Sequence, residues 1–207
     1  MSALSEVFDN GIAEHLSVVQ AITESRALLE RIAVQMSTAL QKGKKIFWCG
    51  NGGSAADSQH LAAEMVGRFL MERRALPSIA LTANTSVLTA IGNDYGYEHV
   101  FERQVEALCA PGDVLVGIST SGNSANVCCA LEQARSMGAF TVAMTGKSGG
   151  RASGIAHETL RMPSAETPRI QEGHILCGHM LCDYIERYLF QSEKGESNLT
   201  AAVPVKE

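Results

Sequence analysis

Residues 48–69 read WCGNGGSAADSQHLAAEMVGRF, a glycine-rich turn followed by a run of good helix formers. The five residues up to the turn, KIFWC at 45–49, form a short apolar run that is typical of a buried strand. Gly50, Gly52 and Gly53 would let the backbone come close to a ligand where the strand ends and the helix begins. The stretch therefore predicts a strand, a ligand-binding turn and a helix.

Two side chains on that helix suggest chemistry. His60 and Glu64 lie four residues apart, so they project from nearly the same face, about 40° apart around the helix axis. An imidazole beside a carboxylate can bind a metal ion or move a proton. A solvated ion pair with no function is the competing interpretation, because such pairs are common on exposed helices.

The rest of the chain predicts an α/β domain. Further apolar runs of strand length lie at 78–82, 113–119, 140–145 and 158–162. Helical patterns lie at 54–68, 98–109, 123–137 and 168–190. Strands that alternate with helices favour a three-layer arrangement, with a parallel sheet covered on both faces. Ligands of such sheets bind where loops leave the carboxyl ends of strands, which directs attention to 50–54, 83–94, 119–124 and 145–150.

A helical extension precedes the sheet. Apolar residues recur at three- and four-residue steps between residues 4 and 42, and Gly43 follows as a helix-ending residue. The pattern predicts one long helix or two end to end, which could pack on another subunit or on their own domain. We therefore divide the chain into N-terminal helices that mediate oligomerisation (1–43), the α/β domain (44–190) and a disordered polar tail (191–207).

Composition excludes several classes of protein. The chain has 207 residues and a formal net charge of −5, without the basic patch that nucleic acid or an anionic membrane surface would require. No apolar run approaches the length of a membrane span, and the acidic N-terminus does not resemble a signal peptide. The six cysteines form no C-x-x-C pair and are expected to be buried thiols. These features predict a cytoplasmic protein.

The loop STSGNSANV at 119–127 predicts a phosphate site. It offers hydroxyl groups at Ser119, Thr120, Ser121 and Ser124, and the helix that follows presents free N–H groups to the same space. Serine is also favoured as an ordinary helix cap, which is the competing interpretation. Four hydroxyls within six residues at the carboxyl edge of a sheet favour phosphate.

Two nucleotide motifs are ruled out. The first glycine loop does not continue as G-x-G-x-x-G, so it is a poor dinucleotide fingerprint. TGKSGG at 145–150 contains G-K-S, but Thr141 stands where a P-loop needs its first glycine. The phosphate is therefore expected on a small substrate.

The last predicted helix carries Gln171, His174 and His179. Around the helix axis, His174 lies about 60° to one side of Gln171 and His179 about 80° to the other side. Spacing therefore does not show which histidine shares a site with Gln171. Each histidine also has a structural interpretation, as do His15, His99 and His157. A carboxylate and an imidazole beside a phosphosugar would suit aldose–ketose isomerisation, which needs a base and an acid next to the carbonyl.

Six motifs together resemble one family. They are CGNGGSAAD, QHLAAE with Arg68 just after, AIGNDYGYE, GISTSGNSANV, TGKSGG and RIQEGHILCGH. The chain resembles the sugar-isomerase (SIS) domain family, and within it the isomerases of sedoheptulose 7-phosphate. The resemblance implies a flavodoxin-like fold and conversion of D-sedoheptulose 7-phosphate to D-glycero-D-manno-heptose 7-phosphate, the first step toward the heptose of lipopolysaccharide. It also implies a homotetramer with active sites at subunit interfaces.

The resemblance also assigns site residues. Glu64 and His179 correspond to the proton-transfer pair, and one zinc ion per subunit is implied. The implied zinc ligands are His60, Glu64, Gln171 and His179. The implied substrate contacts are Asn51, Gly52, Gly53, Ser54, Glu64, Arg68, Asn93, Asp94, Ser119, Thr120, Ser121, Ser124 and Gln171.

Two other functions compete with the enzyme. The same family includes a non-catalytic regulator that binds the replication initiator DnaA, and a sugar-phosphate sensor would bind without turnover. Glu64 and His179, the acid–base pair that the regulator lacks, are both present here. The enzyme is therefore favoured.

Overall fold

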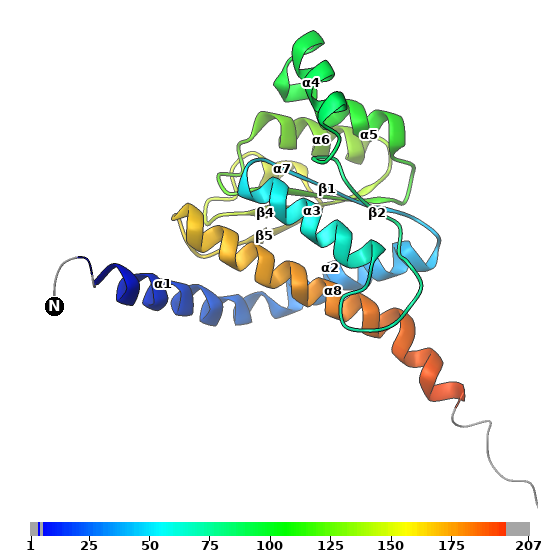
Figure 1. Cartoon of the computed structure of the whole chain (residues 1–207), viewed down its shortest axis with the longest axis horizontal. Coiled ribbons are helices and arrows are strands. Elements are labelled where there is room, and N and C mark those ends of the chain that lie inside the picture. Colours follow the sequence, from blue (N-terminus) through cyan, green and yellow to red (C-terminus); the bar gives the residue numbers. More distant parts are fainter. Residues whose placement is uncertain (1–3, 5, 198–207) are drawn as a thin grey trace, which may run out of the picture.

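The computed structural model describes residue 4 and residues 6–197, and shows a parallel sheet between two helical layers (Figure 1). The strands are β1 (Ile46–Gly50), β2 (Ser78–Ala80), β3 (Val114–Ser119), β4 (Phe140–Thr145) and β5 (Glu158–Arg161). Each coincides with a predicted apolar run. Their order in the sheet is β2-β1-β3-β4-β5, all parallel, which is the flavodoxin-like order that was expected.

The central strands are apolar along their whole length because both faces of the sheet are covered. Every residue of β1 and β3 is buried. Trp48 of β1 is fully buried, and its indole N–H donates to Ser78 Oγ of the edge strand at 2.9 Å. Continuous apolar runs, rather than alternating ones, therefore reflect the two covering layers.

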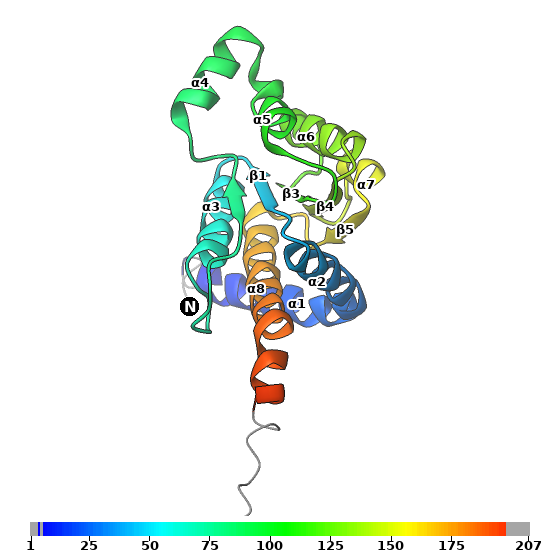
Figure 2. The ribbon, with the colours of Figure 1, turned by 90° about the vertical axis from the view of Figure 1, so that its right-hand side faces the viewer.

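The two layers contain different helices (Figures 1 and 2). One face is covered by α2 (Arg26–Gln41), α3 (Gly53–Val66) and α8 (Thr167–Ser197), and α1 (Glu6–Ile22) packs against α8. The other face is covered by α5 (Glu102–Leu108), α6 (Ala125–Ser136) and α7 (Ala152–Ile155). Each face buries its own apolar core against the sheet.

The N-terminal extension consists of two helices, one of the two predicted possibilities. A short 3₁₀ turn, η1 (Thr23–Ser25), joins α1 to α2. Gly43 follows α2 with φ +72°, the left-handed conformation expected of a glycine that ends a helix. His15 Nδ1 of α1 lies 2.8 Å from Glu172 Oε2 of α8, so the extension packs on its own domain.

Three elements differ from the expectation. The stretch 83–94 was predicted as a loop, but most of it forms α4 (Thr85–Asp94), which projects from the domain (Figure 2). Asn84 caps this helix by accepting the Val87 N–H at 3.1 Å, a start signal that the loop assignment overlooked. The short helix α7 was not predicted, and the helix predicted at 98–109 is divided into a 3₁₀ turn, η2 (Tyr97–His99), and α5.

The last helix is longer than predicted. α8 continues to Ser197 instead of ending near 190, so its end overlaps the stretch assigned to the tail. Residues 198–207 of that tail lie outside the described residues. Among the helices that the structure describes, none combines the length and apolar character of a membrane span.

Gly117, in the middle of β3, provides a test of the packing between sheet and helix. A Cβ at this position would lie 2.8 Å from Val127 Cγ1 and 3.1 Å from Leu131 Cγ, so α6 would have to move away from the sheet. Gly117→Ala is expected to lower the free energy of unfolding by about 1–3 kcal/mol, the usual cost of overpacking a core. Urea denaturation measures the change.

Gly154 of α7 is the matched control, because a Cβ there would have no neighbour within 4 Å. Gly154→Ala is expected to leave stability unchanged or raise it by up to about 1 kcal/mol through the lower entropy of the unfolded chain. Equal effects of the two substitutions would contradict this account of the packing.

Candidate active site

The carboxyl ends of β1, β3 and β4 lie at the same edge of the sheet, and the loops that leave them meet the first turns of α8. The first loop turns sharply at Gly52, whose φ of +56° is costly for a residue with a side chain. The Gln171 amide of α8 lies directly against Gly53, so closely that a Cβ at Gly53 would overlap it. The glycine turn and the start of α8 therefore form two walls of one site.

His60 and Glu64, on the helix that starts at this turn, come together with His179 of α8. Nε2 of His60 lies 2.8 Å from Nε2 of His179 and 3.4 Å from Oε1 of Glu64. The two imidazole rings are perpendicular, at 77°, with centroids 5.0 Å apart. Because the two Nε2 atoms face each other at hydrogen-bonding distance, one donates a proton and the other accepts it. The structure thus brings His60 and Glu64 of α3 together with His179 of α8.

The serine loop after β3 has the geometry expected of an anion-binding loop. Ser119 Oγ lies 2.9 Å from Ser124 Oγ, and Ser124 is the residue before the first turn of α6. Ser121 Oγ accepts the Asn123 N–H at 3.1 Å. Two of the four hydroxyl groups therefore lie together at the N-terminus of α6, the kind of place where phosphate groups bind.

The stretch TGKSGG at 145–150, which the sequence analysis rejected as a P-loop, forms backbone hydrogen bonds with the serine loop. Gly146 N–H donates to Thr120 O at 2.9 Å, and Ala152 N–H donates to Gly122 O at 2.9 Å. A Cβ at Gly122, where φ is +68°, would overlap the backbone of Gly149. The glycines of this stretch are needed for two backbones to touch rather than for binding a nucleotide.

Asn51 is held by a residue that the sequence analysis did not identify. The amides of Asn51 and Asn126 exchange two hydrogen bonds, each 2.9 Å long, and Tyr97 Oη donates to Asn51 Oδ1 at 3.2 Å. Asn126 is buried on the first turn of α6. This amide pair fixes the glycine turn to the helix that follows the serine loop.

Other expected substrate contacts lie apart from this cluster. Asn93 and Asp94 form the end of α4, where Asn93 Nδ2 donates to Asp94 Oδ1 at 2.7 Å. Arg68 is exposed and pairs with Glu72 at 2.8 Å. Within the part of the chain that the structure describes, none of these three side chains bonds to His60, Glu64 or His179. Ser54 is buried at the start of α3, where a Cβ at Gly50 would meet it.

Asp57 also belongs to this region, although sequence analysis did not single it out. It lies three residues before His60 on the same face of α3, a spacing that could have identified it. Burial raises the pKa of its carboxyl group, and the nearby His60 opposes that rise. Asp57 Oδ2 is buried without a hydrogen-bond partner among the described residues. Asp57 is therefore a further carboxyl group near His60, with one unpartnered oxygen among the described residues.

The spatial arrangement distinguishes the two histidines of α8. His174 is fully buried, and its Nε2 lies 3.1 Å from the carbonyl of Thr145 in β4. Burial lowers the pKa of His174 to about 4, against the weaker effect of that hydrogen bond. His174 is thus a neutral core residue, while His179 faces His60. The remaining histidines, His15, His99 and His157, pair with Glu172, Glu102 and Thr141 respectively.

The nitrogen and oxygen atoms of His60, Glu64 and His179 are of the types that bind zinc, but the distances between them match a zinc site only in part. Zinc bonds of about 2.0–2.2 Å in tetrahedral geometry separate neighbouring ligand atoms by about 3.3 Å. The His60–Glu64 separation of 3.4 Å matches this value, while the 2.8 Å between His60 and His179 is shorter. No group of three His, Cys, Asp or Glu side chains among the described residues is arranged to hold a metal. The two rings must move apart for both nitrogens to share an ion.

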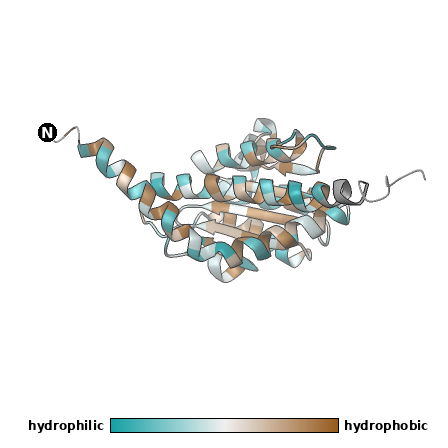
Figure 3. Cartoon of the chain, turned by 90° about the horizontal axis from the view of Figure 1, so that it is seen from below, coloured by the Kyte–Doolittle hydropathy of each residue, from teal (hydrophilic) through white to brown (hydrophobic). Residues whose placement is uncertain are grey.

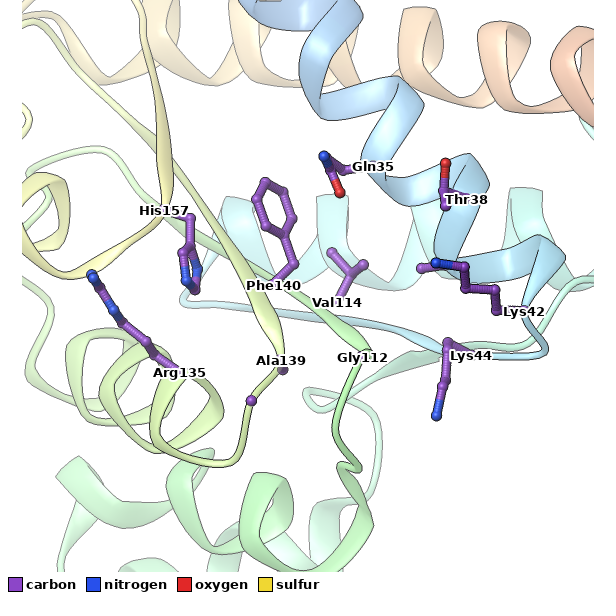
Figure 4. A pocket seen from close by; sticks show the side chains of 12 residues that line it. Gln35, Thr38, Lys42, Lys44, Gly112, Val114, Arg135, Ala139, Phe140 and His157 are labelled. Atoms are coloured by element: carbon purple, nitrogen blue, oxygen red, sulfur yellow. The ribbon is translucent and has the colours of Figure 1, made fainter.

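A hollow of about 350 Å³ lies at the opposite, amino-terminal end of the strands (Figure 4). Three basic residues line it, namely Lys42, Lys44 and Arg135. Arg135 lies on the opposite side of the hollow from the two lysines, and the Lys44 side chain points away from Lys42. The cations do not converge on one point, and the hollow is separate from the His60 cluster.

Comparison with known proteins gives a consistent family. A sequence model of the SIS domain matches residues 11–146. The phosphoheptose isomerase of Aquifex aeolicus is 61% identical over 155 residues, which cover 75% of this chain and 81% of that protein. The solved phosphoheptose isomerase of Neisseria gonorrhoeae superposes with a TM-score of 0.84 at 45% identity, over 89% of this chain and 99% of that one. The phosphoheptose isomerase of Francisella tularensis gives 0.82 at 36% identity, over 90% and 100%.

The buried His174 predicts how stability depends on pH. Its pKa is about 4 in the folded chain and 6.5 when exposed, so the unfolded state binds a proton first as the pH falls. The contribution of His174 to the free energy of unfolding is fully present above pH 6.5 and is lost as the pH falls from 6.5 to 4. Since one pKa unit corresponds to about 1.4 kcal/mol, the loss reaches about 3 kcal/mol. Urea denaturation across this range measures it.

His174→Gln removes the titrating group and is expected to flatten the pH dependence in that window. His99→Gln, which changes a half-buried histidine outside the core, is the control and is expected to keep the slope. The same slope in wild type and His174→Gln would contradict the assignment of a neutral, buried His174.

Proposed function

The chain belongs to the phosphoheptose isomerase family of SIS-domain proteins, and from this membership we infer that it converts D-sedoheptulose 7-phosphate to D-glycero-D-manno-heptose 7-phosphate. The observation that carries the inference is the contact of His60 with both Glu64 and His179, on the helix that starts at the glycine turn. Moving a proton between carbons next to a carbonyl group needs a base and an acid at one place, together with residues that bind the rest of the substrate. We place the reaction at the first step toward the heptose of lipopolysaccharide.

We propose that the serine loop holds the phosphate. Ser119, Thr120, Ser121 and Ser124 would bind its oxygens together with the N–H groups at the start of α6. Asn51 and Gln171, on two walls of the site, would bind hydroxyl groups of the sugar. The Asn51–Asn126 amide pair supports this assignment, because it keeps the Asn51 side chain in one orientation.

The proton transfers are assigned to Glu64 and His179. Glu64 would take a proton from C1 of the ketose while His179 gives a proton to the oxygen on C2, which produces an enediol. Return of a proton to C2 and loss of the proton from the oxygen on C1 would complete the aldose. The roles are supported by the position of both side chains next to His60 and by the need for two groups of different pKa.

Zinc is part of the proposal. His60, Glu64, Gln171 and His179 would hold one ion per subunit, and the ion would polarise the substrate oxygens beside the transferred proton. A carboxylate that binds zinc tightly is a weaker base, so we assign the two roles of Glu64 to different states of the site.

We also propose a homotetramer in which neighbouring subunits complete the active sites. The surface of α1 supports this proposal, because Val7, Phe8, Ile12 and Leu16 of this helix and Leu4 just before it are each at least 60% exposed. Figure 3 shows apolar residues along the part of the helix that extends beyond the domain. An apolar stripe of this kind is usually covered by a partner. The exposed positions of Arg68, Asn93 and Asp94 would then allow them to reach a neighbour's site.

The non-catalytic alternatives, a regulator that binds DnaA and a sugar-phosphate sensor, are not favoured, because the relatives are isomerases. A cytoplasmic location stays a prediction.

Loss of either proton-transfer group is expected to abolish turnover. Glu64→Gln and His179→Gln keep side-chain size but remove the base or the acid, each of which typically contributes about 10²–10⁴-fold to a rate. Isomerisation of sedoheptulose 7-phosphate, followed by NMR with and without added zinc, measures the effect. A Glu64→Gln protein that binds zinc but does not turn over would favour the base role.

His157→Gln is the control, because His157 lies at the amino-terminal end of the sheet beside Thr141. It is expected to keep wild-type kcat. If folded wild type with zinc bound shows no turnover, the isomerase inference is wrong, and binding of DnaA or of the sugar phosphate alone becomes the next measurement.

Charge on the exposed stripe of α1 is expected to break the oligomer. Ile12→Glu would place a carboxylate in the proposed apolar interface, and burying an unpaired charge is costly. Light scattering after size-exclusion chromatography should show species smaller than a tetramer, with lower turnover if sites are shared. Ser17→Glu adds the same charge elsewhere on α1 and serves as the control. A monomeric wild type would refute the proposal.

A further inference from the structure

The segment between α3 and β2 is bound tightly by one carboxylate of α8. Glu186 accepts the backbone N–H groups of Phe69, Leu70 and Met71, each at 2.8 Å, and Nε of Arg73, also at 2.8 Å. Both Glu186 and Arg73 side chains are completely buried. A carboxylate with four donors is one of the arrangements in which a buried charge is fully compensated. The backbone at Phe69 is therefore fixed with respect to α8.

Arg73 connects the same carboxylate to the end of the catalytic helix. Its guanidinium donates to the carbonyl oxygens of Glu64 and Met65 at 2.8 Å and of Gly67 at 3.1 Å. The buried pair thus ties α8 to the backbone of Glu64 and to the segment that follows α3.

The side chain of Phe69 lies against His179. The two rings are nearly parallel, at 22°, with centroids 5.4 Å apart. His60 meets the same imidazole almost at right angles. His179 and Glu186 are seven residues apart on α8, so they share one face of that helix. The imidazole is held by Phe69 along its flat side and by His60 at its Nε2.

We propose that Phe69, fixed by the Arg73–Glu186 pair, is a positioning residue that sets the ring orientation of His179 for proton transfer. The proposal rests on the proposed function. Without the Phe69 ring, the contact with His60 is the one other hydrogen bond or ring contact of the His179 imidazole among the described residues of the zinc-free chain, and the ring can rotate about the bond to its Cβ. A misplacement of a reacting group by about 1 Å can cost 10²-fold in rate.

Phe69 also packs against the core under α8, so the test must separate positioning from packing. Phe69→Leu keeps an apolar side chain and removes the flat surface, whereas Phe69→Tyr restores a ring. Phe190→Leu is the matched control: Phe190 packs against the same core and faces Arg74 instead of His179.

Steady-state kinetics with sedoheptulose 7-phosphate distinguish the two roles. Phe69→Leu is expected to lower kcat about tenfold or more with KM within about twofold, because the residues proposed to bind substrate are untouched. Phe69→Tyr should return kcat to within about twofold of wild type, and Phe190→Leu should keep it. Wild-type kcat in Phe69→Leu, or an equal loss in Phe190→Leu, would overturn the proposal.

A crystal structure of Phe69→Leu provides a readout that does not depend on turnover. The His179 ring is expected to rotate or to adopt more than one orientation, while in Phe190→Leu it should keep the orientation described here. An unchanged ring would overturn the positioning role whatever the activity. Failure of the wild type to isomerise the sugar would instead overturn the proposed function, and the two failures are therefore distinguishable.

Discussion

The close approach of α3 and α8 is the constraint on which the site depends. A Cβ at Gly178 would lie 2.7 Å from both methyl carbons of Leu61, so glycine lets the two helices pack closely here without displacing the buried Leu61 side chain. His179 follows Gly178 in the chain, and His60 precedes Leu61. The contact that brings the helices together therefore also brings the two imidazoles within hydrogen-bonding distance. A larger residue at 178 would have to displace Leu61 or separate the helices, and either change would disturb the site beside it.

Features fixed by local sequence could be predicted. The five strands are visible as short apolar runs because both faces of the sheet are covered, and the helices between them follow from their period. His60 and Glu64 share a helix, so geometry along one element was enough to pair them. The hydroxyl-rich loop was likewise recognisable, since its serines are close in the chain. The helix α4 was missed because the stretch was judged by its position after a strand rather than by its Asn84 cap.

Features that depend on contacts between distant segments could not be predicted from spacing. His174 and His179 lie on opposite sides of Gln171 around the axis of α8, so spacing did not distinguish them. In the structure, His174 lies on the face of α8 that meets β4, and His179 lies on the face that meets α3. For the same reason the sequence did not identify Asn126, whose partner Asn51 is 75 residues away in the chain. It also did not identify Phe69, whose ring contacts His179 only in the folded chain. The family resemblance supplied His179 where local geometry did not.

The two edges of the sheet limit how this molecule can associate. β2 has three residues and follows Pro77, and β5 has four. So few unpaired backbone groups form a poor template for adding a strand from another chain. Any association between copies would therefore depend on side chains of helices and loops, whose specificity is encoded residue by residue, instead of the generic hydrogen-bond ladder that also drives aggregation.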